Sequence, residues 1–178
     1  MIYQPAEDSY LLAKNLEKYL KDKPKSISIL DIGTGSGIQA KTCKNFGFKN
    51  ILTSDLNQEA VSHLKALGFK AVKSDLFSNI NKKQKFDLII FNPPYLPEHR
   101  YDKQKDTTGG KKGYETILKF LTQAKQHLTK DGAILLLFSS LSHPDIIKTH
   151  AKTLGYKLKL LDKKKIPHEE LFVWEFSF

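Results

Sequence analysis

The amino-acid sequence predicts an α/β fold in which a mostly parallel, seven-stranded sheet is covered by helices on both faces. Short apolar runs bounded by turn residues alternate with stretches of helical spacing, and this alternation is typical of parallel strands joined by helices. Near the C-terminus, two further strand-like runs are joined only by "PHEE", which is too short for a helical crossover. We therefore expect these two runs to pair as an antiparallel hairpin.

The expected strands are "SISILDIG" (26–33), "NILTSD" (50–55), "KAVKSD" (70–75), "FDLIIFN" (86–92), "GAILLLFSS" (132–140), "YKLKLLDKKKI" (156–166) and "LFVWEFSF" (171–178). Neither an internal repeat nor a linker interrupts them, so residues 1–178 are expected to form one domain. Two consecutive prolines, Pro93 and Pro94, should end the fourth strand because proline cannot donate to a sheet ladder.

The expected helices lie between these strands. The first, over 6–22, should place Tyr10, Leu11, Leu12, Leu16, Tyr19 and Leu20 on one buried face. Gly47, Gly68 and Gly132 follow helical stretches and are expected to end them in a left-handed conformation.

Composition restricts the function classes. The chain has 178 residues, of which 40% are hydrophobic and 27% are charged, as in ordinary globular domains. It has neither a signal-peptide pattern nor a long apolar run, so a cytoplasmic protein without membrane association is expected. Cys43 is the single cysteine and is expected to pack in a helix. No histidine spacing suggests a metal site.

The formal net charge of +10 is compatible with a nucleic-acid partner, because a basic face attracts phosphate. However, Arg100 is the only arginine, and lysines spread over helices and loops often form just a solvated surface. One basic cluster lies directly after the two prolines and could dock an acidic or phosphate-rich partner. It comprises His99, Arg100, Lys103, Lys105, Lys111 and Lys112.

A glycine-rich turn follows the first expected strand. "LDIGTGSG" places Gly33, Gly35 and Gly37 where a ligand can approach the backbone at the start of a helix. The spacing is G-x-G-x-G instead of the G-x-G-x-x-G of dinucleotide sites, because position 38 is isoleucine. A dinucleotide pyrophosphate is therefore not the best fit.

Polar residues end the strands that surround this turn: Asp31, Asp55, Asp75 and Asn92. Asp55 can accept both hydroxyls of a ribose, and Asp75 can accept from an adenine amine, with Leu76 and Phe77 beside the ring. A single aspartate after a strand is often only a helix cap, but four polar residues at carboxyl ends indicate a site in the switch-point crevice. Acceptors for ribose and adenine without a phosphate-binding lysine suggest S-adenosylmethionine.

At this point the chain resembles the class I methyltransferases, which have a Rossmann-like fold. "DIGTGSG" is similar to their cofactor motif, and "NPPY" (Asn92, Pro93, Pro94, Tyr95) to the catalytic motif of enzymes that methylate a planar nitrogen. Such a nitrogen is a poor nucleophile and must be held in line with the methyl group. Asn92 and the Pro93 carbonyl can accept its two hydrogens, the prolines fix the backbone, and Tyr95 can pack on the planar group.

The motifs "YQPAEDSYLL", "NPPYLP", "GGKKGYE" and "EELFVWEF" together resemble the short HemK-like methyltransferases of archaea and eukaryotes. These enzymes modify the glutamine of the Gly-Gly-Gln loop in class I release factors. The resemblance implies that residues 1–25 form a helix closing over the cofactor, with Ser9 at its methionine end. It also implies that Asp31, Gly33, Asp55, Asp75, Leu76 and Asn92 complete the cofactor site. Local physics explains "PAEDS" equally well, as a helix start with acids in the first turn.

The resemblance leaves the target and the partners open. Loop 96–112 is expected to contact the substrate, and some family members need a small zinc-binding activator protein, for which the strand edge near "KAVKSDLF" offers an apolar docking place. The alternative substrate is an adenine in RNA or DNA, favoured by the net charge and by "NPPY". Because base flipping usually needs aromatic wedges, and few candidates exist beyond Tyr95 and Tyr101, the protein substrate is preferred.

Overall fold

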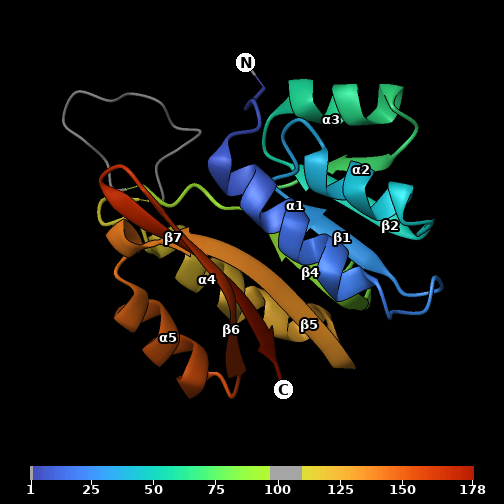
Figure 1. Ribbon diagram of the computed structural model, residues 1–178. Helices are drawn as coiled ribbons and strands as arrows, with labels where there is room; N and C mark the ends of the chain where they lie inside the picture. The colour runs from blue at the N-terminus through green and yellow to red at the C-terminus, as the bar shows by residue number, and fades with distance from the viewer. Residues whose placement is uncertain (1, 97–109) are drawn as a thin grey trace.

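The computed structural model describes residues 2–96 and 110–178, and a seven-stranded sheet forms its middle layer (Figure 1). The strands are β1 (Ile29–Ile32), β2 (Ile51–Asp55), β3 (Lys70–Lys73), β4 (Phe86–Phe91), β5 (Leu128–Ser139), β6 (Lys157–Ile166) and β7 (Glu169–Ser177). Their order in the sheet is β3-β2-β1-β4-β5-β7-β6. Strands β1 to β5 pair in parallel, whereas β7 is antiparallel to both β5 and β6. The predicted sheet and its C-terminal hairpin are confirmed.

Helices cover both faces of the sheet, as expected (Figure 1). On one face lie α1 (Glu7–Leu20), α2 (Ile38–Asn45) and α3 (Gln58–Ala66), and on the other α4 (Glu115–Ala124) and α5 (Pro144–Thr153), with short 3-10 helices at Lys125–His127 and Ser140–Ser142. The interior strand β5 contributes to both hydrophobic cores, because its side chains alternate between the two faces of the sheet. Leu135 and Leu137 pack with the α1–α3 face, whereas Leu136 and Phe138 pack with the α4–α5 face.

The apolar face of α1 is narrower than the sequence suggested. Leu12, Leu16 and Leu20 are fully buried, as predicted. Tyr10, however, is 58% exposed, so its expected burial was wrong. The helix turns Asp8, Ser9 and Asn15 toward the protein instead. These polar side chains are buried because each has hydrogen-bonding partners there.

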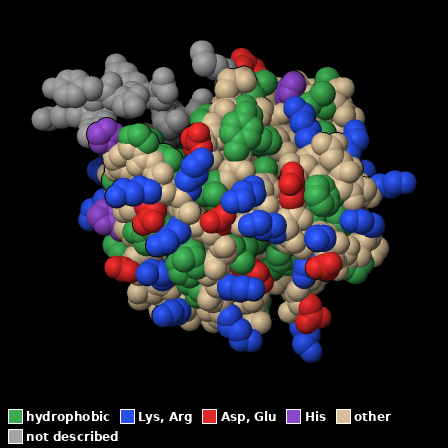
Figure 2. All heavy atoms as spheres, viewed as in Figure 1, with side chains coloured by type: hydrophobic (Ala, Val, Ile, Leu, Met, Phe, Trp, Pro, Cys, Tyr) green, Lys and Arg blue, Asp and Glu red, His purple; other side chains and the backbone are tan. Residues whose placement is uncertain are grey.

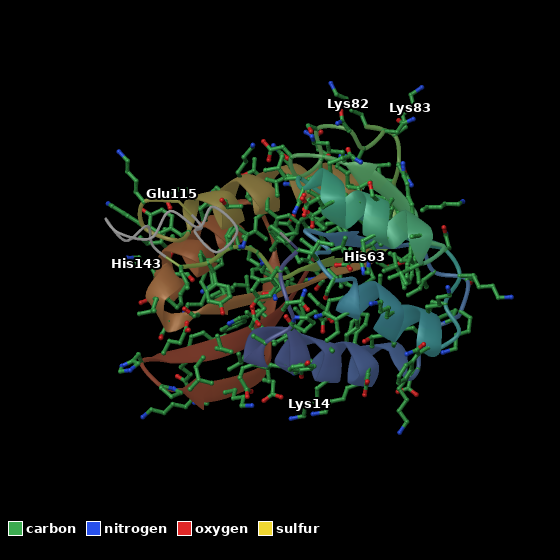
Figure 3. All side chains as sticks on the ribbon, turned by 90° about the horizontal axis from the view of Figure 1, so that it is seen from above. Lys14, His63, Lys82, Lys83, Glu115 and His143 are labelled. Atoms are coloured by element: carbon green, nitrogen blue, oxygen red, sulfur yellow. The ribbon has the colours of Figure 1, made fainter. Side chains whose placement is uncertain are left out.

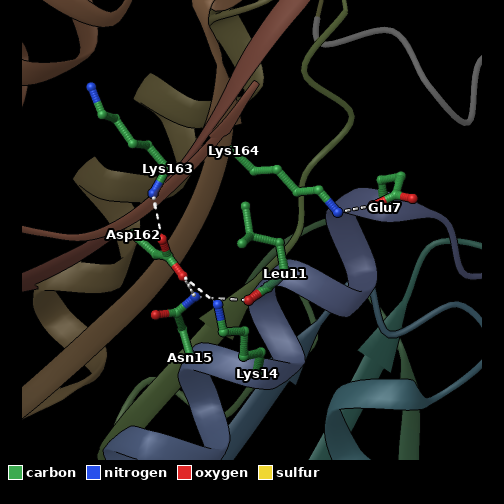
Figure 4. Close-up of polar contacts among 7 residues, drawn as sticks. All are labelled: Glu7, Leu11, Lys14, Asn15, Asp162, Lys163 and Lys164. Carbon is green, nitrogen blue, oxygen red and sulfur yellow. Dashed lines mark hydrogen bonds and ion pairs between the residues drawn. The ribbon is translucent and has the colours of Figure 1, made fainter. Parts of the chain in front are cut away.

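Polar contacts fix α1 against the edge strand β6 (Figure 4). The Asp162 carboxylate accepts hydrogen bonds from Asn15 Nδ2 at 3.1 Å and from Lys14 Nζ at 3.3 Å. Lys164 pairs with Glu7 in the first turn of the helix. Asp162 follows an irregularity in the pairing of β6 with β7, and this shift in register turns its carboxylate toward α1. The start of α1 is thereby held beside the carboxyl ends of the strands.

Of the three glycines expected to end helices, two do so and one lies inside a strand. Gly47 and Gly68 have φ angles of 87° and 80° and follow α2 and α3, as predicted. Gly132 was wrongly assigned, because the fourth helical stretch ends at His127 and β5 begins at Leu128, four residues earlier than expected. Gly132 therefore lies inside β5, where a Cβ atom would be 2.9 Å from the Phe86 carbonyl oxygen. A close approach between strands requires this glycine.

Lysines are spread over the visible face of the molecule, with acidic side chains between them (Figure 2). This distribution favours a solvated surface over one continuous phosphate-binding patch on that face. Lys111 and Lys112 are exposed, whereas His99, Arg100, Lys103 and Lys105 of the basic cluster lie outside the described residues. Within the described part of the chain, helices long and apolar enough to cross a membrane are absent.

Candidate methyl-transfer site

A cavity of about 260 Å³ lies at the carboxyl ends of the parallel strands. It contains most of the site residues expected from the sequence: Gly33, Gly35, Asp55, Asp75, Leu76, Asn92, Pro93, Pro94 and Tyr95. Figure 3 shows Glu115 and His143, at the starts of α4 and α5, on the same side of the molecule. Because the cavity lies at the carboxyl ends of β1 and β4, where the strand order reverses direction, it occupies the switch-point crevice in which α/β sheets bind ligands.

The glycine-rich turn lies under one end of this cavity. Gly33 has a φ of 61°, and a Cβ atom there would be 3.2 Å from the Phe91 ring. Gly37 has a φ of 82° and begins α2, where a Cβ atom would be 2.8 Å from Leu64. Both positions need glycine for conformation and for space. Gly33 and Gly35 also line the cavity, so the backbone of this turn is accessible to a ligand there.

Asp31 does not line the cavity, although the resemblance implied a cofactor contact. Its carboxylate is buried beneath the turn and accepts a hydrogen bond from Thr34 Oγ1 at 2.7 Å. Burial raises the pKa of Asp31 to about 7, against the opposing effect of the Thr34 hydrogen bond. The geometry thus gives Asp31 a supporting place under the turn, and direct contact with a cofactor stays a prediction.

The raised pKa of Asp31 predicts a pH-dependent stability. Between its ordinary value of 3.8 and about 7, the folded state keeps a proton on Asp31 that the unfolded state releases. This contribution to stability is therefore full below pH 3.8 and is lost as pH rises to about 7, at up to about 1.4 kcal/mol per pH unit. Urea denaturation across this range should show a smaller decline for Asp31→Asn. Equal slopes for both proteins would contradict the assignment.

Asp55 connects the ends of β1 and β2. Its carboxylate accepts from the backbone N–H of Gly35 at 2.8 Å and from that of Asn57 at 2.8 Å. These bonds hold the glycine-rich turn beside the start of α3 and leave further lone pairs on the carboxylate. Asp55 lines the cavity, so its predicted role as a hydroxyl acceptor fits the geometry.

Asp75 and Leu76 form another side of the cavity. Asp75 is exposed and pairs with Lys119 Nζ of α4 at 3.0 Å. Leu76 has a φ of 50°, a conformation that costs a residue with a branched side chain about 1–3 kcal/mol and often marks a functional site. Phe77 was expected beside the ligand, but it packs in the core against Phe120 and His127. The unusual backbone at Leu76 turns these two neighbours in different directions.

Strand β4 ends at Phe91, directly before Asn92 and the two prolines, as predicted. The Asn92 side-chain nitrogen donates to the Asp8 carboxylate at 3.0 Å. Its amide oxygen is buried and has no hydrogen-bond partner among the described residues. A buried acceptor without a partner is costly and needs an explanation. The partner that is missing here has to be a hydrogen-bond donor.

The resemblance implied that residues 5–9 close over the cofactor, but two residues at this site, Asp8 and Ser142, were not singled out from the sequence. Asp8 lines the cavity, whereas its neighbour Ser9 does not. The Ser9 hydroxyl donates to Asp8, and its carbonyl accepts from Gln39 of α2, so Ser9 faces inward. Ser142, which is fully buried, donates from its hydroxyl to the Tyr95 carbonyl at 2.9 Å. The Asp8–Asn92 and Ser142–Tyr95 contacts each join segments far apart in sequence, so local patterns carried no signal for them.

Ser142→Ala is expected to loosen the segment that carries Asn92. Loss of the bond to the Tyr95 carbonyl should lower the free energy of unfolding by about 1–3 kcal/mol, the cost of a buried acceptor without its donor. Methyl transfer should fall as well, because the position of Tyr95 becomes less defined. Urea denaturation and a transfer assay would measure both effects. The exposed Ser62 of α3 offers a control, and equal behaviour of Ser142→Ala and Ser62→Ala would contradict the expectation.

The sheet order, the glycine-rich turn and the cavity beside Asn92 together define a class I methyltransferase, a class of enzymes that uses S-adenosylmethionine. The chain belongs to the methyltransferase small domain family, whose model matches residues 6–156. Within the described part of the chain, no group of metal-ligating side chains could hold a metal ion.

Individual relatives support this assignment. A Methanocaldococcus jannaschii protein, provisionally named a protein N5-glutamine methyltransferase, is 37% identical over 97% of this chain and 89% of its own length. The mouse methyltransferase HEMK2 is 28% identical over 99% of this chain and 89% of its own. Among solved structures, Mtq2 of E. cuniculi, in complex with Trm112, superposes with a TM-score of 0.82 at 26% identity, covering 99% of this chain and 98% of that one. These matches confirm the resemblance to HemK-like methyltransferases.

Proposed function

We propose that this enzyme transfers the methyl group of S-adenosylmethionine to the side-chain amide nitrogen of a glutamine in a translation release factor. The cofactor would bind in the cavity, with the open backbone at Gly33 and the Asp55 carboxylate on its nucleoside side. Apolar side chains, including Leu56, Leu76 and Phe91, also line the cavity and suit an adenine ring. When bound, the cofactor supplies an electrophilic methyl group.

The choice of a planar nitrogen as the methylation target rests on the buried amide oxygen of Asn92, which has no hydrogen-bond partner among the described residues. An amide nitrogen has two hydrogens and a delocalised lone pair, so it must be oriented and kept from water before it can react. Asn92 Oδ1 accepts one of these hydrogens, and the Pro93 carbonyl accepts the other. Tyr95 packs on the planar group, with its backbone fixed by Ser142. The nitrogen loses a proton readily once its fourth bond has formed, so no strong base is required.

The relatives support glutamine as the target. The M. jannaschii relative carries the name of a glutamine methyltransferase, and the E. cuniculi Mtq2–Trm112 complex is described as responsible for methylation of the termination factor eRF1. An adenine amine is also a planar nitrogen with two hydrogens, and the net charge of +10 suits a nucleic acid. The lysines of Figure 2, however, are dispersed among acidic side chains. The protein target is therefore the proposal, and nucleic acid is the competing outcome.

The test is methyl transfer from radiolabelled S-adenosylmethionine to a purified class I release factor. A factor with the Gly-Gly-Gln glutamine changed to alanine and bulk RNA serve as parallel substrates. We expect label on the intact factor alone. Label on RNA, or equal label on the alanine version, would overturn the proposed target while leaving the methyltransferase class in place.

A small zinc-binding activator protein of the Trm112 kind is proposed as a partner. The supporting observation is the position of β3, which lies at the edge of the sheet and pairs only with β2 among the described strands. An unpaired edge can accept a further strand. The edge is less apolar than expected, because Ala71 and Leu76 are buried while Lys70 and Lys73 are exposed. Repeating the transfer assay with and without purified Trm112 would show whether the activator is needed.

A further inference from the structure

The Asp8 carboxylate accepts hydrogen bonds from groups on two sides. Within its own segment, Asp8 Oδ1 accepts from the Ser9 backbone N–H at 2.6 Å and from the Ser9 hydroxyl at 3.2 Å. The Tyr3 hydroxyl donates to the two carboxylate oxygens at 3.0 and 3.1 Å. From the end of β4, Asn92 Nδ2 donates to Oδ2 at 3.0 Å. Asp8 is 5% exposed, so this network is shielded from water.

The chemistry of this contact determines which atom of Asn92 remains available. An ionised carboxylate can only accept hydrogen bonds, so it pairs with the amide nitrogen of Asn92 and repels the amide oxygen. The oxygen therefore faces away from Asp8, and it is the buried atom that lacks a partner among the described residues. The two ends of an asparagine amide have nearly the same shape. If Asp8 did not hold the amide nitrogen, the side chain could turn that nitrogen toward the target. Two donors would then face each other.

We propose that Asp8 is a positioning residue that sets the orientation of the Asn92 amide and so selects a target that donates a hydrogen. Tyr95 belongs to the same arrangement. Burial raises the pKa of its phenol above the ordinary value, and the nearby charge of Asp8 raises that pKa further. Asp8, Asn92 and Tyr95 all line the same cavity. This inference rests on the proposed function, because it concerns how the target nitrogen is recognised.

A simpler explanation is that Asp8 only stabilises the start of α1, where a carboxylate interacts favourably with the helix dipole. A merely structural role predicts that changes at Asp8 and Asn92 act independently. The positioning role predicts that the two residues act as a donor–acceptor pair. An exchange of the pair separates these explanations, because it reverses the direction of one hydrogen bond and preserves the shapes of both side chains.

The experiment compares Asp8→Asn, Asn92→Asp and the double variant with both changes, using the full-length chain and a purified release factor. Asp8→Asn should lower kcat about 10- to 100-fold, since a misplaced target nitrogen costs this much, and leave the Kd for S-adenosylmethionine within about twofold. Asn92→Asp places two carboxylates together and should cost at least as much. In the double variant, Asn at position 8 donates to a carboxylate at position 92, whose other oxygen still faces the target. Its kcat should recover to within about tenfold of the wild type.

Two kinetic outcomes would overturn the inference. One is a kcat of Asp8→Asn within twofold of the wild type. The other is a double variant whose loss equals the product of the two single losses, as independent structural damage would give. A wild-type enzyme that labels no release factor would instead count against the proposed substrate, and the kinetic comparison would then be made with the substrate that is labelled.

A measurement without any substrate tests the same contact. In a spectrum of 15N-labelled protein, the Asn92 side-chain proton bonded to a carboxylate should lie downfield of ordinary side-chain amides, with Asn92→Ala identifying the signal. Asp8→Asn should move that proton upfield, because a neutral acceptor forms a weaker bond. An unmoved signal would overturn the contact itself. Thermal unfolding of each variant confirms that the comparison is made on folded protein.

Discussion

Asn92→Ala is expected to reduce the rate of methyl transfer by about 10²–10³-fold, as observed when one preorganised hydrogen-bonding group is removed from an active site. The alanine removes the oxygen that would accept from the target nitrogen and also removes the donor to Asp8. The cofactor should bind almost as well as before, because Asn92 acts mainly on the target. Single-turnover transfer to the release factor, with calorimetry for S-adenosylmethionine, would measure the two effects separately.

The exposed Asn45 of α2 offers a matched control for this prediction, because it does not line the cavity. Asn45→Ala should retain wild-type rates and cofactor affinity. Unchanged turnover of Asn92→Ala would remove Asn92 from the proposed mechanism. A large loss of cofactor affinity with a normal rate at saturation would move Asn92 from target recognition to cofactor binding.

Sequence patterns predicted the strand ends well because the signals there are local. A buried apolar run that stops at Asp55 or Asn92 places a polar group at the carboxyl edge, whatever the rest of the chain does. Gly33 and Gly37 were recognisable for the same reason, since their positive φ angles belong to one tight turn. The parallel topology then brings these separate ends together, and this step follows from the alternation of strands and helices.

Contacts that depend on how distant elements pack were not predictable in this way. Asp8 and Asn92 are 84 positions apart, and their hydrogen bond joins the first turn of α1 to the residue that follows β4. The sequence therefore indicated an acidic helix start at "PAEDS" but not which of its side chains faces the cavity. The same holds for Ser142, whose partner carbonyl at Tyr95 is 47 positions away. Gly132 was wrongly placed because glycine is favoured both at a helix end and where two strands approach closely, as Gly132 and Phe86 do here, so the sequence alone does not distinguish the two.

Asp55→Ala should weaken the binding of S-adenosylmethionine by about 1.5–3 kcal/mol, the usual cost of losing hydrogen bonds to a charged group. This loss corresponds to an increase in Kd of about ten- to a hundredfold. Asp55 also accepts from Gly35 and Asn57, so its removal frees the glycine-rich turn as well. Calorimetry would measure the loss, with the exposed Asp22 changed to alanine as the control.

The loss of affinity in Asp55→Ala has two sources, the missing contact with the ribose and the freed glycine-rich turn. Comparing two ligands in the wild type and the variant separates them. S-adenosylhomocysteine and its 2′-deoxy analogue differ only in a ribose hydroxyl. If Asp55 accepts from that hydroxyl, the wild type should bind the deoxy analogue more weakly, whereas Asp55→Ala should bind the two ligands almost equally. If the wild type and the variant discriminate to the same extent, the ribose does not bind at Asp55, and the effect of the substitution comes from the freed backbone at Gly35.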